Sequence, residues 1–347
     1  MVRKTLKGRV SLIAAVAALA LTTAACGGNG GGATTTPPAG GTTSDSTEAG
    51  APSGELTELA IVVAPLHYEP AYIAQREGIF EQHGLDVEIK RGQDPASLIA
   101  MLMSGEVQIA TSSFIPLAAS VIEGLPLKII AGNGQVDPDF DNSGVMVAPD
   151  SGITEMSQLE GKTIGVTGIN TGGSLPFMQR LEDSGVPIDA LTQVVIPFAG
   201  MQAALEQGTV DAVFAVDQAY HQMLAAGYPS IASPTREVQT NMPVTVWIGQ
   251  EPWLAENGEI IDAFVAAMAE ADAIYMENDA LAREVHAEIN QVPVEEVTQN
   301  LVPISTEINV NPAERGLASA AHFGVIAEEI TLDELLWEGV PLNTDVE

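Results

Sequence analysis

The sequence predicts an α/β fold of two lobes with a ligand cleft between them. Strand-like and helix-like segments alternate from residue 56 to about residue 250, which is typical of a parallel-rich sheet with helical crossovers. The alternation is interrupted at Asn133–Asn142 and then starts again. We therefore expect a first lobe from residues 56–143 and 244–347, a second lobe from residues 144–243, and a cleft at the carboxyl ends of their strands.

The N-terminus reads as a separate segment. Four basic residues precede an apolar run from Val10 to Leu21, and small residues lead from there to Cys26. This order resembles a bacterial lipoprotein signal, in which the cysteine becomes the lipidated first residue. A transmembrane anchor is the alternative, but it needs about 20 apolar residues. We expect residues 1–26 to be the signal and the lipid on Cys26 to hold the exported protein at the outer face of the cytoplasmic membrane. Residues 27–55, rich in Gly, Thr, Pro and Ser, are expected to form a flexible tether.

Composition excludes several classes of protein. The net charge of −33 argues against nucleic acid as a partner. Cys26 is the only cysteine, so a disulfide, a thiolate metal cluster or a cysteine nucleophile is not expected in the folded part. A hydrophobic content of 46% is enough to build cores.

The first lobe is predicted from apolar, β-branched runs that are separated by helix signals. Proline or Asp-Pro opens the expected helices, and glycine closes them. Strands are expected at Leu59–Ala64, Leu85–Lys90, Val107–Ala110 and Leu127–Ala131. Helices are expected from Pro70 to Gly78, from Asp94 to Met103, and from Ser112 or Ser113 onward.

The second lobe is predicted from the same pattern. Strands are expected at Gly144–Ala148, Lys162–Val166, Gln193–Ile196 and Val210–Ala215, and a return strand to the first lobe at Pro243–Gly249. Helices are expected after Ser174, at Ala199–Gln207 and at Asp217–Ala226. Beyond the return strand, apolar residues from Ile261 to Tyr275 recur at helical spacing, which predicts a helix packed on the core.

Residues 159–181 read as strand, small-residue loop and helix in immediate succession. Thr171 to Ser174 offer hydroxyls and N–H groups where the helix with Pro176 in its first turn begins. The first N–H groups of a helix have no internal partner and lie at the positive end of its dipole, so this turn is suited to an anionic or strongly polar ligand. The alternative is a tight turn with a serine cap and nothing bound.

A weak internal echo also favours two lobes. Residues 103–110 can be aligned with residues 206–213, with a helix, a glycine and a strand in each. If the echo is structural, Ser112–Ser113 and Ala215–Asp217 are equivalent strand ends that face a common cleft.

Several motifs together resemble a known family. They are Tyr68–Ile89, Ser104–Ala110, Gly124–Lys128, Leu159–Val166 and Gln207–Ala212. Both the order of these motifs along the chain and their residues resemble those of the solute-binding proteins of ABC importers in the nitrate, sulfonate, taurine and thiamine-pyrimidine group. The resemblance covers about residues 56–250 well and the C-terminal helices only loosely. It implies a bilobal type II periplasmic-binding-protein fold that closes on a small ligand.

The resemblance also implies where the ligand is held. The family's contacts carry over to His67, Tyr68 and Glu69, to Ser112 and Ser113, to Thr167, Asn170, Thr171, Gly172, Gly173 and Ser174, and to Asp217. The family often has Glu-Pro where this chain has Asp217-Gln218. We add Tyr220 and Trp247, which with Tyr68 are candidates for an apolar wall. Each aromatic residue has ordinary core packing as its alternative, and Asp217 has a helix cap.

The function implied is capture of a small sulfonate-, nitrate- or taurine-like anion for an ABC permease and ATPase by a monomer without a cofactor. Binding of a thiamine-pyrimidine precursor or another aromatic heterocycle is the runner-up, and an exported sensor domain is a third reading. Catalysis is not expected. Fungal relatives that make a thiamine pyrimidine rely on a cysteine-rich motif, and no cysteine follows Cys26. No second histidine lies at metal-ligand spacing from His67.

Overall fold

The computed structural model describes residues 55–297 and 302–346. The predicted signal, Cys26 and all but the last residue of the tether lie outside the described residues. Within residues 55–297 and 302–346, no helix is both long enough and apolar enough to cross a membrane. The strands expected in the two lobes are found in two separate sheets, which are called here the first and second sheet. The lobe boundaries at residues 143/144 and 243/244 stay predictions.

The first sheet has five strands in the order β2-β1-β3-β9-β4. They are β1 (Thr57–Val63), β2 (Leu85–Arg91), β3 (Ile109–Ser113), β4 (Leu127–Gly132) and β9 (Thr245–Gln250). β1 pairs in parallel with β2 and β3, whereas β9 runs antiparallel to β3 and β4. The carboxyl ends of β1, β3 and β4 and the amino end of β9 therefore share one edge of the sheet. Ser112 and Ser113 are the last residues of β3, because that strand extends to pair with β9.

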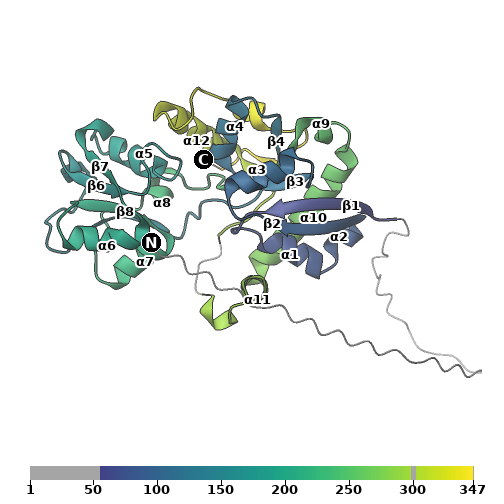
Figure 1. Cartoon of the computed structure of the whole chain (residues 1–347), viewed down its shortest axis with the longest axis horizontal. Coiled ribbons are helices and arrows are strands. Elements are labelled where there is room, and N and C mark those ends of the chain that lie inside the picture. The colour runs from purple at the N-terminus through teal and green to yellow at the C-terminus, as the bar shows by residue number, and fades with distance from the viewer. Residues whose placement is uncertain (1–54, 298–301, 347) are drawn as a thin grey trace, which may run out of the picture. The chain divides into compact units, whose positions relative to one another are not determined.

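Helices cover both faces of the first sheet. One face carries α1 (Glu69–Arg76), α2 (Ile79–Gln82), α10 (Gly258–Glu277) and α11 (Asp279–Asn290), and the other carries α3 (Pro95–Met103) and α4 (Phe114–Ile122) (Figure 1). The predicted apolar stripe on α10 is confirmed, because Ile261, Phe264, Met268, Ala271 and Tyr275 are all buried. The chain also forms α9 (Glu251–Leu254), α12 (Val310–His322), α13 (Leu332–Leu335), and the two-stranded pairing of β10 (Ile308–Asn309) with β11 (Leu342–Asn343).

The second sheet has four strands in the order β5-β8-β6-β7. They are β5 (Ser143–Val147), β6 (Thr163–Val166), β7 (Thr192–Val195) and β8 (Ala212–Val216). β6 is parallel to β7 and β8, and β5 is antiparallel to β8. Its helices are α5 (Leu175–Asp183), α6 (Phe198–Glu206), α7 (Asp217–Ala225) and α8 (Pro234–Val238). Short 3-10 turns lie at Met156–Leu159, Ile188–Ala190 and Val294–Glu296.

Two chain segments connect the sheets, and they pair with each other. Val136 N–H donates to the carbonyl of Met242 at 3.0 Å, and Val244 N–H donates to the carbonyl of Gly134 at 2.8 Å. A later stretch joins this pair, since Gln135 N–H donates to the carbonyl of Pro303 at 2.9 Å. The two segments are thus hydrogen-bonded to each other near the first sheet, at Gly134 and Val136, and we call residues 133–142 and 239–244 the crossing segments.

Candidate functional site

A hydrogen-bonded cluster lies at the strand-end edge of the first sheet. Thr245, the first residue of β9, pairs in register with Ser113. Its Oγ1 lies 2.8 Å from Nδ1 of His67, 3.2 Å from Nδ2 of Asn133 and 3.0 Å from the backbone nitrogen of Gly134. The loop after β1, the first crossing segment and the start of β9 therefore meet at one hydroxyl group beside the end of β3, and we call this arrangement the Thr245 hub.

His67 is held in a constrained position within the hub. Its backbone has a φ of 55°, which is uncommon for a residue with a side chain. The imidazole lies against Gly134, where an added Cβ would come within 2.0 Å of Nδ1. Burial lowers the pKa of His67 to about 4, and the nearby charge of Glu69 offsets only part of this effect. The ring is therefore neutral at pH 7.

Tyr68 and Glu69 turn away from the hub. The Tyr68 side chain is buried, its hydroxyl lies 3.0 Å from Nδ1 of His286, and the guanidinium of Arg91 lies 5.0 Å from its ring centre. The carboxylate of Glu69, also buried, lies 2.8 Å from the same nitrogen of His286. Through His286, these two residues connect the start of α1 to α11. They therefore help to hold the loop that contains His67 in place.

Asp217 stands at the equivalent edge of the second sheet. It follows β8 directly, has a φ of 50°, and its N–H donates to the carbonyl of Asn142 at 2.9 Å. Its carboxylate accepts a hydrogen bond from the side-chain amide of Asn142, in a crossing segment. Tyr220 lies in the core, because its ring covers Gly144 so closely that a Cβ there would come within 2.4 Å of Cε2.

The turn before α5 leaves backbone donors free. The hydroxyl of Ser174 accepts from Thr171 N–H at 3.0 Å and donates to the carbonyl of Thr171 at 3.0 Å, so it closes the turn. Asn170 enters the turn with a φ of 51°. The N–H groups of Gly172 and Gly173 have no hydrogen-bond partner within the described part of the chain. The turn therefore presents two unpaired donors at the positive end of a nine-residue helix.

This turn lies against the first sheet's strand-end edge. A Cβ built on Gly172 would lie 3.9 Å from Cγ2 of Ile115, which stands two residues after Ser113. The turn at Thr171–Gly173 therefore lies near the first turn of α4, which begins directly after Ser112–Ser113. His67 is linked to the same strand end through the register of Ser113 with Thr245.

The predicted apolar wall needs correction. Trp247 is 1% exposed, and its ring packs edge-on against Phe264 at a centroid distance of 5.1 Å, inside the core between β9 and α10. Tyr68 and Tyr220 are also core residues. Side chains alternate between the two faces of β9, and Trp247 lies on the face that packs against α10. The sequence pattern alone did not show which face Trp247 occupies. We therefore leave all three aromatic side chains out of the proposed site.

Exposed apolar side chains occur at strand ends instead. Leu66, Ile169 and Phe198 are 43%, 45% and 41% exposed. Each stands three positions after the last residue of a parallel strand, namely β1, β6 and β7. The sequence reasoning missed them. The signal that points to them is a large apolar residue within three positions after a strand, in the strand-end loop for Leu66 and Ile169 and at the start of α6 for Phe198.

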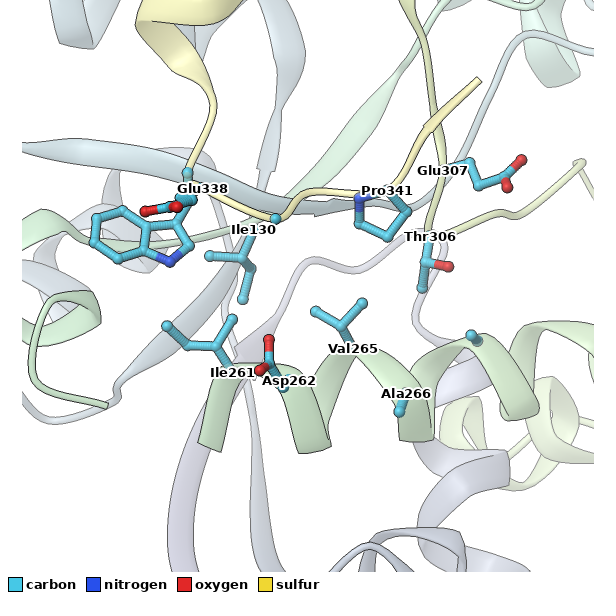
Figure 2. Close-up of a pocket in the computed structure, with 12 residues that line it drawn as sticks. Ile130, Ile261, Asp262, Val265, Ala266, Thr306, Glu307, Glu338 and Pro341 are labelled. Carbon is cyan, nitrogen blue, oxygen red and sulfur yellow. The ribbon is translucent and has the colours of Figure 1, made fainter. Parts of the chain in front are cut away.

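A separate cavity of about 370 Å³ lies between α10 and the C-terminal segment (Figure 2). Its lining combines apolar side chains with carboxylates, and it includes Ile130, Ile261, Val265, Asp262, Glu307 and Glu338. None of the predicted site residues borders it, and its carboxylates would repel an anion. Among the described residues, no group of three or more His, Cys, Asp or Glu side chains is arranged to hold a metal ion.

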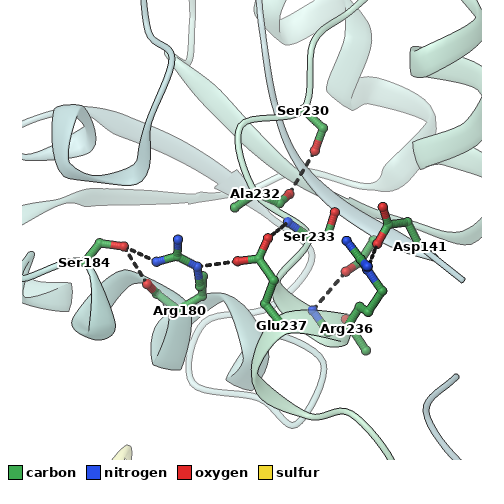
Figure 3. Close-up of polar contacts among 10 residues, drawn as sticks. Asp141, Arg180, Ser184, Ser230, Ala232, Ser233, Arg236 and Glu237 are labelled. Atoms are coloured by element: carbon green, nitrogen blue, oxygen red, sulfur yellow. Dashed lines mark hydrogen bonds and ion pairs between the residues drawn. The ribbon is translucent and has the colours of Figure 1, made fainter. Parts of the chain in front are cut away.

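The cations near the second sheet are already paired. Arg180 on α5 forms an ion pair with Glu237 on α8, and Arg236 forms one with Asp141 in the first crossing segment (Figure 3). Glu237 also accepts from Ser233 N–H at 2.8 Å, which ties α8 to its own start. The sequence reasoning missed Arg236, because it lies on a short helix that the sequence did not predict.

Comparison with known proteins gives consistent matches. Residues 66–282, more than half of the chain, match the family described as NMT1/THI5 like. The 4-amino-5-hydroxymethyl-2-methylpyrimidine phosphate synthase of Aspergillus parasiticus is 26% identical over 241 residues, which are 65% of this chain and 68% of the synthase. The taurine-binding periplasmic protein of Escherichia coli (strain K12) is 24% identical over 213 residues. That match covers 60% of this chain and 64%, less than two thirds, of the relative.

A solved structure extends the likeness to the fold. The putative periplasmic sulfonate-binding protein SsuA from Methylobacillus flagellatus KT superposes with a TM-score of 0.67 at 16% sequence identity. The superposition covers 84% of this chain and 98% of that protein. The predicted fold class is confirmed by this match, since it is the fold of periplasmic binding proteins.

Proposed function

This chain belongs to the NMT1/THI5-like family, and we propose that it is the solute-binding component of an ABC importer that captures a small anion between two closing lobes. The taurine-binding relative and the sulfonate-binding structural neighbour support transport of a solute. The observation that carries the proposal is the pair of unpaired N–H groups at Gly172 and Gly173, with Gly172 near Ile115 in the first turn of α4.

The anion is held by uncharged donors. The N–H groups of Gly172 and Gly173, the hydroxyls of Ser112, Ser113 and Thr171, and the start of α5 supply partial positive charge. The ion pairs of Arg180 and Arg236 support this assignment, because those two cations already have carboxylate partners. Oriented N–H groups stabilise an anion without a formal counter-charge, since they point at it before it arrives.

A thiamine-pyrimidine ligand is the second candidate, and the pyrimidine phosphate synthase among the relatives favours it. That ligand would need aromatic side chains on which to stack. Tyr68, Tyr220 and Trp247 are all buried, which favours the anion instead. A purely binding role, without catalysis, is supported by the sequence, which has no cysteine after Cys26 and so lacks the cysteine-rich motif expected of the pyrimidine-forming branch.

The proposal includes a place in the cell and partners. The N-terminal signal pattern ending at Cys26 supports export and a lipid anchor at the outer face of the cytoplasmic membrane. The protein delivers the solute to an ABC importer made of a permease and an ATPase. It acts as a monomer.

A thermal-shift screen of residues 51–347 tests the proposal. The panel contains ethanesulfonate, taurine, nitrate and a hydroxymethylpyrimidine. A ligand at 100 times its dissociation constant stabilises the folded state by about 2.7 kcal/mol, enough to raise the melting temperature measurably. We expect at least one anion to do so and the neutral pyrimidine to have no effect. Stabilisation by the pyrimidine alone would replace the anion with the second candidate.

A further inference from the structure

The proton of the Thr245 hydroxyl has only one available acceptor. A hydroxyl group has one proton and two lone pairs. The backbone N–H of Gly134 and the amide Nδ2 of Asn133 can only donate, and they lie 3.0 and 3.2 Å from Thr245 Oγ1. These two donors occupy both lone pairs. The proton must then point at the third neighbour, Nδ1 of His67, at 2.8 Å.

The orientation of the Asn133 amide is fixed independently. Its Nδ2 lies 3.1 Å from the backbone carbonyl of His67, which can only accept. A flipped amide would place two oxygen atoms against each other, so the orientation follows from its neighbours. Asn133 is 1% exposed, and its Oδ1 has no hydrogen-bond partner among the described residues, so the contact of Nδ2 with the His67 carbonyl is what distinguishes the two orientations.

The hub therefore determines the tautomer of His67. Because Nδ1 accepts the proton of Thr245, it carries none of its own, and the proton of the neutral ring lies on Nε2. Nε2 has no hydrogen-bond partner within the described residues, and it is not among their buried unpaired polar atoms. His67 follows the carboxyl end of β1, on the edge where Ser113 and the start of β9 also lie.

We propose that His67 is a neutral hydrogen-bond donor anchored on the crossing segments, which binds an acceptor oxygen of the ligand through Nε2, and that Thr245 is the positioning residue that fixes this tautomer. The ligand contact rests on the proposed function, whereas the tautomer does not. A solute oxygen, such as one of a sulfonate or nitrate, fits this donor. A solute that presents an N–H or ammonium group there would leave two donors face to face, so the same nitrogen discriminates against it.

Nitrogen NMR of the mature protein with ¹⁵N-labelled histidine tests the tautomer without any ligand. At pH 7 we expect the His67 signals of an unprotonated Nδ1 and a protonated Nε2, assigned by their loss in His67→Gln. Thr245→Ser keeps the hydroxyl and should keep this pattern, whereas Thr245→Val removes it and should let the proton exchange between the two nitrogens. A protonated Nδ1 in the wild type overturns the proposal.

Calorimetric binding of ethanesulfonate, taurine and nitrate tests the contact. In His67→Gln the amide nitrogen reaches the position of Nε2, whereas in His67→Asn the amide reaches only the position of Nδ1. We expect Asn to weaken binding about tenfold or more and Gln to weaken it less, since one lost hydrogen bond to a charged group costs about that much. His83→Gln, which changes a histidine paired with Glu270 at the end of α2, is the control and should bind as wild type does.

The outcomes separate the proposals. Equal binding by wild type, His67→Asn and His67→Gln overturns the ligand contact and leaves the proposed function standing. Failure of the wild type to bind any of the three solutes, two anions and the zwitterionic sulfonate taurine, overturns the proposed function and with it the contact. The NMR result decides the tautomer in either case. Thr245→Ser is the control for Thr245→Val, because it substitutes the same position and keeps the hydroxyl.

Discussion

Single side chains at the strand ends owe their chemical state to their neighbours. One ring nitrogen of His67 is hydrogen-bonded to the hydroxyl of Thr245. Both lone pairs of that hydroxyl accept hydrogen bonds from Asn133 and Gly134 in the first crossing segment. An imidazolium would place two protons between Nδ1 and Oγ1, which adds to the cost of taking its charge out of water. The sequence marked His67 as a site residue, but it could not show Thr245 and Asn133, because they are 178 and 66 positions away.

The lowered pKa of His67 predicts a pH-dependent stability. Its folded pKa is about 4 and its unfolded pKa about 6.5, so the unfolded state binds more protons between these values. The free energy of unfolding therefore falls by about 1 to 3 kcal/mol as the pH falls from 6.5 toward 4. The upper value corresponds to the full shift of the His67 pKa, and the lower value allows for partial exposure of the side chain. Urea unfolding over this range should show the loss in wild type and a smaller loss in His67→Gln. Identical pH profiles would contradict the account.

Elements were predicted well where their periodicity is local. The strands of both sheets and the helices α1, α3, α5, α6 and α7 agree with the sequence within a few residues, since β-branched runs, prolines and glycines mark them. α8 was missed, because five residues after Ser233 carry no apolar period. The end of β3 was placed too early, because its last residues owe their strand conformation to pairing with β9.

The orientation of aromatic side chains could not be predicted in the same way. Trp247 and Tyr220 lie in elements whose ranges were predicted correctly, but which face each presents depends on the sheet and helix packed against it. Leu66, Ile169 and Phe198 have the opposite outcome, since they are exposed despite their apolar character. Pattern identifies an element, whereas burial of one side chain requires knowledge of its neighbours.

The start of α5 allows a charge test of the anion. Thr171 is exposed in the turn, and Thr171→Asp adds a carboxylate beside the free N–H groups of Gly172 and Gly173. A like charge at about 4 Å costs roughly 1 kcal/mol even in water, so calorimetry should show an anion bound at least about fivefold more weakly. A carboxylate near a helix N-terminus favours the helix, so the fold should persist.

Thr171→Asn is the matched control for that substitution, because it has the same size without the charge. It should bind the anion more tightly than Thr171→Asp. Equal affinity of Thr171→Asp and wild type would mean that the anion is not held at this turn.

The molecule as a whole depends on pairings that are distant in the sequence. The crossing segments pair with each other, and residues 303–309 join them, with Asn309 Nδ2 donating to Gln135 Oε1 at 2.6 Å and to the carbonyl of Asn241 at 2.9 Å. α12 contacts both α4 and α5. The sequence predicted a break between the lobes at Asn133–Asn142, but not this third stretch, because no local pattern reports contacts across 68 and 174 positions.

Attachment to the membrane is predicted to depend on Cys26 alone. Cys26→Ser removes the acceptor of the lipid without altering residues 55–297 and 302–346, so the protein should be found in the soluble fraction and should melt at the same temperature. Membrane fractionation with a blot measures this. A variant that stays on the membrane after its signal is cleaved would contradict the lipid anchor.

We propose that the protein closes around a small anion, and small-angle scattering measures this closure in solution. Two bodies joined by the crossing segments are expected to move together by a hinge, with little change inside each. Saturating anion, chosen as the strongest stabiliser among ethanesulfonate, taurine and nitrate, should lower the radius of gyration of wild type. Thr171→Asp at the same concentration should show a smaller decrease. An unchanged radius of gyration in the wild type, with the anion bound by calorimetry, would contradict closure.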